Sequence, residues 1–330
     1  MKLFTSSYLL IAFVAAGAVL IAALTAAIVF GGPKPPPAMT AINAPFKAVD
    51  FSDMPPLKYF TAGDGASLAY RYYRPFPEAV RGSVVLVHGS SASSNSMHVL
   101  AKAFARAGYA AYALDMRGHG HSGPKGTISY IGQLEDDLSS FTHAVSLAKP
   151  ATLAGFSSGG GFVLRFAGSR RQDDFQNYLL LSPFLGPDAP NYRPDSGGWV
   201  NVGVPRIVAI TALNLIGIRT FNDMPVTSFA LNEEAKEFLT PGYSFALAAN
   251  FQPQRDYKAN IRAVHQPCAV VAGTSDEAFF TDRLEGTFRS LGKNWPVTLL
   301  PGVGHIPLTL ESSAVNAAVQ AVDGMRAKVD

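Results

Sequence analysis

Cysteine is nearly absent from this chain, since Cys268 is the only one among 330 residues. A single cysteine excludes an intramolecular disulfide and a cysteine-rich metal site, and it leaves the redox compartment open. Its place at the start of an apolar run favours a small core residue over a reactive thiol. The 7 histidines include no H-E-x-x-H spacing, so a zinc site is not predicted either. We therefore expect no metal and no cofactor.

Charged residues are also scarce, at 15% of the chain, and the formal net charge is +3. No run of lysine and arginine marks a nucleic-acid surface, so we expect no nucleic-acid partner. The length of 330 residues is sufficient to bury a full core. It suits one large α/β domain of about 250 residues with additions better than two equal domains.

The N-terminal region contains no charged residue between Lys2 and Lys34. Within it, residues 8–30 form a run of 23 almost entirely apolar residues. About 20 are needed to cross a bilayer, whereas the apolar core of a cleavable signal peptide usually has about 7 to 15. We predict that residues 1–30 are an uncleaved transmembrane anchor. The alternative is a signal sequence cut near the alanine-rich residues 22–27.

The charges that flank this run bear on its orientation. The amino terminus and Lys2 favour a cytoplasmic N-terminal end, which places the rest of the chain on the non-cytoplasmic (periplasmic) side. Lys34 and Lys47 lie beyond the run and oppose this argument. The sequence Gly-Gly-Pro-Lys-Pro-Pro-Pro after the run cannot continue a helix. We therefore expect residues 31–54 to be a stiff, extended linker between membrane and domain.

From residue 55 onward, short apolar runs alternate with helical patterns. The predicted strands are 57–61, 67–73, 83–88, 110–114, 151–156, 177–182, 267–272 and 297–300. The predicted helices are 98–107, 131–148, the segment after Ser157, 281–291 and 306–325. Such alternation is typical of a mostly parallel sheet with helices on both faces.

Residues 186–263 interrupt this alternation. They contain several prolines, Trp199 and the apolar stretch 207–218, which at 12 residues is too short to cross a membrane. Because the interval lies between core strands, we predict an inserted helical cap that covers the C-terminal edge of the sheet and lines a substrate pocket. A buried core helix is the alternative for 207–218.

A glycine-framed serine follows one predicted strand. Gly155, Ser157 and Gly159 form G-x-S-x-G at a strand-to-helix turn, where the serine hydroxyl is held clear of the backbone. Further polar segments follow other predicted strands: His88-Gly89-Ser90, residues 115–122 (Asp-Met-Arg-Gly-His-Gly-His-Ser), Gly273-Thr274-Ser275-Asp276 and Gly304-His305. Because the carboxyl ends of parallel strands share one edge of a sheet, these segments are expected to meet near Ser157.

The order Ser157, Asp276, His305 and the D-x-R-G-H-G-x-S segment at 115–122 resemble the α/β-hydrolase superfamily. Within it, the similarity is to the monoacylglycerol lipase or lysophospholipase-like group that includes the S33-type serine aminopeptidases. The resemblance covers residues 55–328 and implies an α/β-hydrolase fold with a mostly parallel eight-stranded sheet. One departure is Gly-Phe-Ser-Ser-Gly-Gly where the group commonly has Gly-His-Ser-Met-Gly-Gly.

The resemblance implies a nucleophile at Ser157, a base at His305 and an acid at Asp276, with backbone N–H groups of Ser90 and Ser158 as the oxyanion hole. The chemistry of these residue types is consistent with these roles. A serine hydroxyl needs a base to become a nucleophile, and histidine is suited to that role near pH 7. A carboxylate orients the histidine ring. The remaining candidates are two alternative acids, Asp188 and Asp282, and four expected loop-ordering groups, His88, Arg117, His119 and His121.

We therefore expect a membrane-anchored serine hydrolase that cleaves a carboxylic ester of a monoacylglycerol or lysophospholipid through an acyl-enzyme intermediate. An aminopeptidase or amidase on the same residues is one alternative, and Glu233, Glu234 and Glu237 would supply the acidic pocket that it needs. A charged, solvated helix face explains these glutamates equally well. The other alternative is an inactive, membrane-tethered module that binds lipids.

Overall fold

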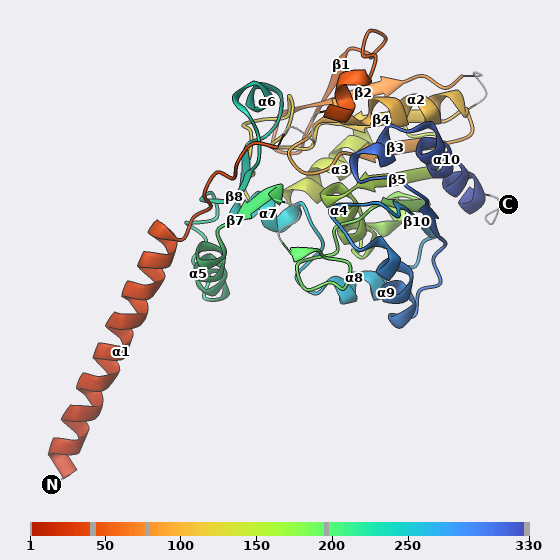
Figure 1. The fold of residues 1–330 in the computed structure, drawn as a ribbon. Coiled ribbons are helices and arrows are strands. Elements are labelled where there is room, and N and C mark those ends of the chain that lie inside the picture. Colours follow the sequence, from red (N-terminus) through yellow and green to blue (C-terminus); the bar gives the residue numbers. More distant parts are fainter. Residues whose placement is uncertain (1, 40–43, 77–79, 195–197, 327–330) are drawn as a thin grey trace.

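An eight-stranded sheet forms the centre of the computed structural model, which describes residues 2–39, 44–76, 80–194 and 198–326, with side chains from residue 11 onward (Figure 1). In spatial order the strands are β1 (Leu57–Thr61), β2 (Ser67–Tyr73), β4 (Ala110–Leu114), β3 (Ser83–Val87), β5 (Ala151–Phe156), β6 (Asn177–Leu181), β10 (Cys268–Gly273) and β11 (Val297–Leu300). β2 is antiparallel to both of its neighbours, and the other neighbouring pairs are parallel. The mostly parallel sheet predicted from the sequence is confirmed.

Helices cover both faces of this sheet. α2 (His98–Arg106) and α10 (Ser312–Arg326) pack on one face, and α3 (Gln133–Ala144), α4 (Ser158–Ala167), α8 (Tyr257–Ala263) and α9 (Leu284–Ser290) pack on the other. Strand β3 shows why its sequence is apolar throughout. Val84 and Leu86 pack on the face covered by α2 and α10, whereas Val85 and Val87 pack on the opposite face. Because side chains alternate along a strand, a strand buried on both faces needs no polar position.

Three predicted helices differ from the observed ones in length. The helix expected at 131–148 is α3, which begins after Gly132. The φ angle of Gly132 is 111°, a left-handed conformation that an α-helix does not contain. The helix expected at 306–325 is divided into a short 3₁₀ turn (Ile306–Thr309) and α10. The helix expected at 281–291 is likewise divided into a 3₁₀ turn (Thr281–Arg283) and α9.

The insertion between β6 and β10 forms a cap with a sheet of its own. β7 (Val200–Val202), β8 (Pro225–Phe229) and β9 (Gly242–Ser244) are antiparallel and are accompanied by α5 (Val204–Leu215), α6 (Glu233–Phe238) and α7 (Phe245–Asn250). The helices were expected, but the small sheet was not, because β7 and β9, with three residues each, are too short to show an alternating pattern. α8 lies at the end of the predicted interval and packs against α4 beside the main sheet.

Helix α5 is only partly buried, in contrast to the core helix considered as an alternative. Ala209 and Ile210 are buried, and Ile210 packs with Val226 and Phe245. Val208, on another side of the helix, is 62% exposed. α5 is therefore a surface helix of the cap.

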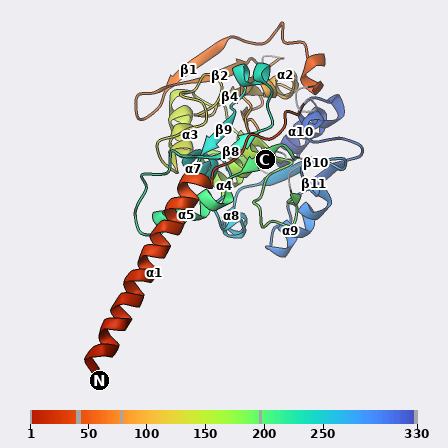
Figure 2. The same cartoon turned by 60° about the vertical axis from the view of Figure 1, so that its left-hand side comes forward.

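Helix α1 (Lys2–Phe30) extends away from the domain and lies beside α5 at its C-terminal end (Figures 1 and 2). Its segment Ile11–Phe30 is long and apolar enough to cross a membrane. Arg206 of α5 donates hydrogen bonds to the carbonyl oxygens of Ile28 (2.7 Å) and Val29 (3.1 Å). This guanidinium donates to two of the carbonyls that lack intrahelical donor partners at the end of α1.

The residues after α1 lie along the cap. The backbone N–H of Lys34 donates to Oδ1 of Asn201 at 2.7 Å, and that of Met39 donates to the carbonyl of Ala230 at 2.9 Å. Residues 31–39 form neither helix nor strand and contact the cap, and Ala44–Ala48 form a 3₁₀ helix within the interval 31–54 that was expected to be extended. The division into anchor, linker and domain at residues 30 and 54 stays a prediction.

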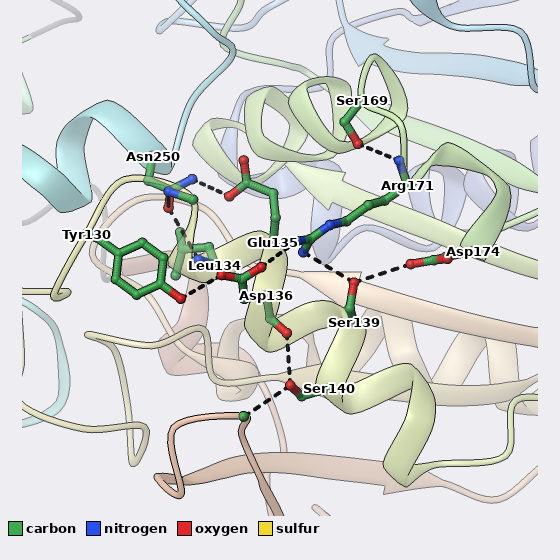
Figure 3. A network of polar contacts seen from close by, with 12 residues as sticks. Tyr130, Leu134, Glu135, Asp136, Ser139, Ser140, Ser169, Arg171, Asp174 and Asn250 are labelled. Atoms are coloured by element: carbon green, nitrogen blue, oxygen red, sulfur yellow. Dashed lines mark hydrogen bonds and ion pairs between the residues drawn. The ribbon is translucent and has the colours of Figure 1, made fainter.

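A polar network joins α7 of the cap to the start of α3 in the core (Figure 3). Asn250 of α7 accepts hydrogen bonds at Oδ1 from the backbone N–H groups of Gly132 (2.8 Å) and Leu134 (3.3 Å). Its Nδ2 donates to Glu135 at 2.5 Å. Because the first N–H groups of a helix lack intrahelical acceptors, Asn250 completes the start of α3.

Candidate active site

Ser157 lies at the turn between β5 and α4, as predicted. Its φ and ψ angles are 57° and −120°, a conformation that costs a residue with a side chain about 1–3 kcal/mol. The neighbouring strand holds it, because its N–H donates to the carbonyl of Leu181 at 2.9 Å. Its own carbonyl accepts from the N–H groups of Gly161 and Phe184, both at 3.0 Å. The surrounding core thus maintains a strained backbone at the candidate nucleophile.

The two glycines of the motif allow segments to approach this turn closely. A Cβ atom on Gly159 would lie 2.2 Å from the carbonyl oxygen of His88 at the end of β3. A Cβ atom on Gly155 would lie 2.3 Å from the carbonyl oxygen of Gly159. Both neighbouring atoms are backbone, so no side chain fits at either position without moving the strand or the helix.

The structure brings together the three residues predicted as nucleophile, acid and base. His305 Nε2 lies 3.0 Å from Ser157 Oγ, and His305 Nδ1 lies 2.8 Å from Asp276 Oδ2. All three are buried, with at most 8% of each residue exposed. If Nδ1 carries the proton and donates to Asp276, Nε2 is free to accept the serine proton. This is the tautomer in which His305 can act as a general base toward Ser157.

Asp276 is held as a carboxylate. Its Oδ1 accepts from the backbone N–H groups of Ala278 (2.8 Å) and Phe279 (2.9 Å). Burial raises the pKa of Asp276, but the adjacent His305 and the hydrogen bonds outweigh this effect and bring the pKa below its ordinary value. The alternative acids, Asp188 and Asp282, are both exposed.

Three residues around His305 were not identified from the sequence. The backbone N–H of His305 donates to Glu277 at 2.9 Å. The rings of Phe156 and Phe279 pack against the imidazole, with centroids 4.6 and 5.2 Å away. Phe156 is the residue that departs from the usual Gly-His-Ser pattern, so the sequence did contain a signal for it. Its side chain forms an apolar wall against the candidate base.

The predicted oxyanion donors lie at a helix start and in a loop beside Ser157. Ser158 is the first residue of α4, so its N–H has no acceptor within the helix, and a helix N-terminus favours negative charge. A Cβ atom on Gly89 would lie 3.4 Å from Cβ of Ser157, so the loop passes directly beside that residue. The carbonyl of Gly89 faces Nδ1 of His88 at 2.8 Å. Because the C=O and N–H of a trans peptide point in opposite directions, this contact also fixes the direction in which the N–H of Ser90 points.

The loop-ordering residues form a buried polar cluster. His88 Nε2 accepts from the backbone N–H of Met116 at 3.2 Å, and burial lowers the pKa of His88. Arg117 binds Asp137 through two nitrogens, each at 2.7 Å, and also pairs with Asp64. Burial, reinforced by the His88 ring, lowers the pKa of His119 well below its ordinary value. His88 thus contacts the segments that follow β3 and β4, whereas Arg117 contacts α3 and the turn between β1 and β2.

His121 differs from the other loop-ordering candidates because 60% of its side chain is exposed. Its backbone N–H donates to the buried Asp115 at 2.8 Å. Among the residues that the structure describes, no group of three or more histidine, cysteine, aspartate or glutamate side chains is arranged to hold a metal ion. Cys268 is buried, and burial raises the pKa of its thiol.

A family model described as serine aminopeptidase, S33, matches residues 78–309, which is well over half of the chain. The chain belongs to this family. The S33 model ends four residues after His305, so Ser157, Asp276 and His305 all lie within the match. The α/β-hydrolase resemblance inferred from the sequence is thereby confirmed.

Two curated relatives match part of this S33-family chain. A monoacylglycerol lipase from Mycolicibacterium smegmatis is 32% identical over 130 residues, which is 38% of this chain and 45% of the lipase. A non-haem chloroperoxidase from Kitasatospora aureofaciens is 31% identical over 125 residues, which is 37% of this chain and 42% of that protein. The chain therefore matches less than half the length of either relative.

Solved structures resemble the S33-family chain over more of its length. A soluble variant of monoglyceride lipase from Saccharomyces cerevisiae, in complex with a substrate analogue, has a TM-score of 0.60 at 18% identity and covers 83% of this chain and 96% of its own. A membrane phospholipase A, described as a bacterial virulence factor, has a TM-score of 0.56 at 17% identity and covers 99% of both chains. These similarities establish the shared α/β-hydrolase fold.

Proposed function

We propose that this S33-family hydrolase is a membrane-anchored enzyme that cleaves carboxylic esters of monoacylglycerol or lysophospholipid type. The observation that carries the proposal is the buried chain of contacts from Ser157 Oγ through His305 to Asp276, at 3.0 and 2.8 Å. The names of the Mycolicibacterium relative and of the lipase and phospholipase structures support an ester substrate.

In the proposed reaction, Ser157 Oγ attacks the ester carbonyl carbon while its proton passes to His305 Nε2. The carbonyl oxygen becomes negative and accepts hydrogen bonds from the N–H groups of Ser158 and Ser90. Collapse of this intermediate breaks the bond to the leaving alcohol, which takes the proton from His305. Water then attacks the acyl-enzyme in the same way, and the acid product leaves as Ser157 regains its proton. Asp276 orients the ring and stabilises its cationic form throughout.

The surface beside α1 supports an amphiphilic substrate and a membrane partner. Val204, Val208 and Leu215 are 57%, 62% and 81% exposed, and their spacing places them on one face of α5. Apolar area of this kind is stabilised by contact with lipid. The cap helix thus presents an apolar stripe next to the predicted anchor, and the similarity to the membrane phospholipase A extends over 99% of both chains.

We propose a single-pass anchor with the hydrolase domain on the periplasmic side, on the basis of Lys2 and the uncharged run that follows it. Added protease would then digest the domain in spheroplasts as well as in lysed cells. Protection in spheroplasts would contradict the orientation, and recovery of the protein in the soluble fraction would contradict the anchor.

The ester activity is tested with p-nitrophenyl esters of short and long acyl chains. We expect wild-type protein to hydrolyse them and Ser157→Ala to lose at least about 10⁴-fold in kcat. Ser290→Ala removes a hydroxyl from α9, far from this turn in the sequence, and serves as the matched control. Equal activity, or equal inactivity, of wild type and Ser157→Ala would overturn the mechanism.

An aminopeptidase on the same residues requires an acidic pocket for the free amino group. Glu233, Glu234 and Glu237 lie on α6 with exposed side chains, and Glu233 pairs with Lys236. This arrangement is that of a solvated helix face and favours the ester over the peptide substrate. Faster turnover of aminoacyl arylamides than of esters would reverse this choice.

Covalent labelling distinguishes an active enzyme from an inactive lipid-binding module. A fluorophosphonate probe is expected to modify wild-type protein at Ser157 and to leave Ser157→Ala unmodified. Failure to label the wild type would favour the binding module.

A further inference from the structure

The loop that carries the oxyanion donor Ser90 is held by the cap. We call residues Gly89, Ser90 and Ser91 the oxyanion loop. Ser91 is buried, and its φ of 66° lies in the left-handed region that residues with side chains rarely adopt. A loop in this conformation persists only where surrounding contacts over-determine it.

The cap supplies these contacts at Ser91. The backbone N–H of Ser91 donates to the hydroxyl oxygen of Tyr243 at 2.6 Å, and its Oγ donates to the carbonyl of Thr240 at 2.6 Å. The N–H of Thr240 donates back to the carbonyl of Ser91 at 2.8 Å. The donors and the carbonyl of Ser91 are therefore all paired with one short cap segment, residues 240–243.

A second cap residue contacts Ser90 itself. Nε1–H of Trp199 donates to Oγ of Ser90 at 3.2 Å, and the indole ring stacks on Phe229 of β8 with ring centroids 5.1 Å apart. Trp199 thus connects the side chain of the oxyanion residue to the small sheet of the cap.

The hydroxyl of Tyr243 contacts both the oxyanion loop, at Ser91, and His119. It lies 2.8 Å from Nε2 of His119, and Nδ1 of His119 lies 3.3 Å from the carbonyl of Arg117. Because that carbonyl can only accept, Nδ1–H of His119 donates to it and Nε2 accepts from Tyr243. The hydroxyl oxygen of Tyr243 is then free to accept from Ser91. Burial raises the pKa of Tyr243 and lowers that of His119, so both stay neutral and the direction of the chain is fixed.

We propose that Tyr243 is a positioning residue for the reaction, and that with Thr240 and Trp199 it holds the oxyanion loop in the conformation that aims the N–H of Ser90 at the developing oxyanion. The oxyanion hole is then complete only when the cap is seated on the core. This inference rests on the ester-hydrolase function proposed above.

The test removes only the Tyr243 hydroxyl. The contacts of Asn250 with the core do not involve this hydroxyl and hold the cap in Tyr243→Phe, while Ser91 loses its acceptor and His119 loses the donor to its Nε2. In the full-length protein with p-nitrophenyl butyrate, we expect kcat to fall roughly tenfold, which is part of the 10²–10³-fold cost of losing a donor outright. KM is expected to change by less than about twofold, since the donor acts mainly in the transition state.

Two further readouts separate positioning from a general structural effect. The acid limb of the kcat–pH profile reports the catalytic base, so its midpoint is expected to stay in place in Tyr243→Phe. Trp199→Phe keeps an aromatic ring on Phe229 but removes the N–H, and a smaller fall in kcat, about threefold, is expected. Tyr178→Phe is the matched control, because it also removes a buried tyrosine hydroxyl, one that donates to the carbonyl of Gln172 at 2.7 Å.

Equal kcat values for Tyr243→Phe and Tyr178→Phe would overturn the inference. A rise in KM at unchanged kcat would also overturn it, because Tyr243 would then act in substrate binding. A fall in kcat that only matches the loss of folded protein in thermal unfolding would overturn it as well. A wild type without esterase activity or probe labelling would instead overturn the proposed function, and this inference with it.

Discussion

The two halves of the candidate site are held by different parts of the molecule. Ser157, Asp276 and His305 follow core strands and are positioned by core partners such as Leu181 and Glu277. The oxyanion loop follows another core strand, but the strained residue within it is paired with the cap. The proposed nucleophile, base and acid are therefore positioned by the sheet, whereas one proposed oxyanion donor lies in a loop that is paired with the inserted cap. Substitutions should be able to affect each half separately.

The largest effect is expected on the core-held half. In Asp276→Asn, an amide N–H faces His305 Nδ1 and favours the wrong ring tautomer, so kcat is expected to fall by about 10³–10⁴ with the fold retained. Asp188→Asn and Asp282→Asn are matched controls on exposed carboxylates. The measurement is kcat on p-nitrophenyl butyrate with circular dichroism of each variant. An equal loss in either control and none in Asp276→Asn would reassign the acid.

An intermediate effect is expected where the halves meet. Gly159→Ala places a Cβ atom 2.2 Å from the carbonyl of His88, so the start of α4 and the end of β3 must separate. We expect a loss of about 1–3 kcal/mol in the free energy of unfolding. Because Ser158 and Ser90 flank this contact, a fall in kcat of about 10²-fold is also expected.

Gly286→Ala is the control for this substitution, since nothing lies within 4 Å of a Cβ built at Gly286 in α9. Added helix propensity there is expected to stabilise by up to about 1 kcal/mol. Chemical unfolding and kcat distinguish the two variants. An unchanged Gly159→Ala would show that the two halves do not share this contact.

The smallest effect is expected from protonation on the cap-held half. Burial keeps the pKa of His119 well below its ordinary value, so folded His119 stays neutral as the pH falls below about 6.5 while the unfolded chain binds a proton. The unfolded state then binds more protons, and the free energy of unfolding falls with decreasing pH by up to about 1.4 kcal/mol per unit for this group.

Urea unfolding in detergent at pH 7, 6 and 5 measures this slope. We expect His119→Gln to show a shallower dependence than wild type, and His143→Gln, at an exposed position of α3, to match wild type. Parallel slopes for wild type and His119→Gln would contradict a neutral, buried His119.

Much of the fold was predictable because burial leaves a strong signal in the sequence. Each observed strand of the main sheet begins and ends within one residue of its predicted limits. β3 illustrates the reason, since a strand buried on both faces must be apolar at every position. The cap sheet and the contact of residues 31–39 with the cap left no such pattern, because short strands and single backbone hydrogen bonds do not require a particular residue type.

The sequence by itself determined which residues could react: a serine between glycines, a histidine and an aspartate after later strands, and a histidine–glycine pair beside them. Those residue types are required by the chemistry, so they are visible without coordinates. Only the tertiary structure decided what the oxyanion loop contacts. Ser91 and Tyr243 are 152 positions apart, and a hydrogen bond between two loops constrains neither the spacing nor the hydrophobic pattern of the segments that it joins.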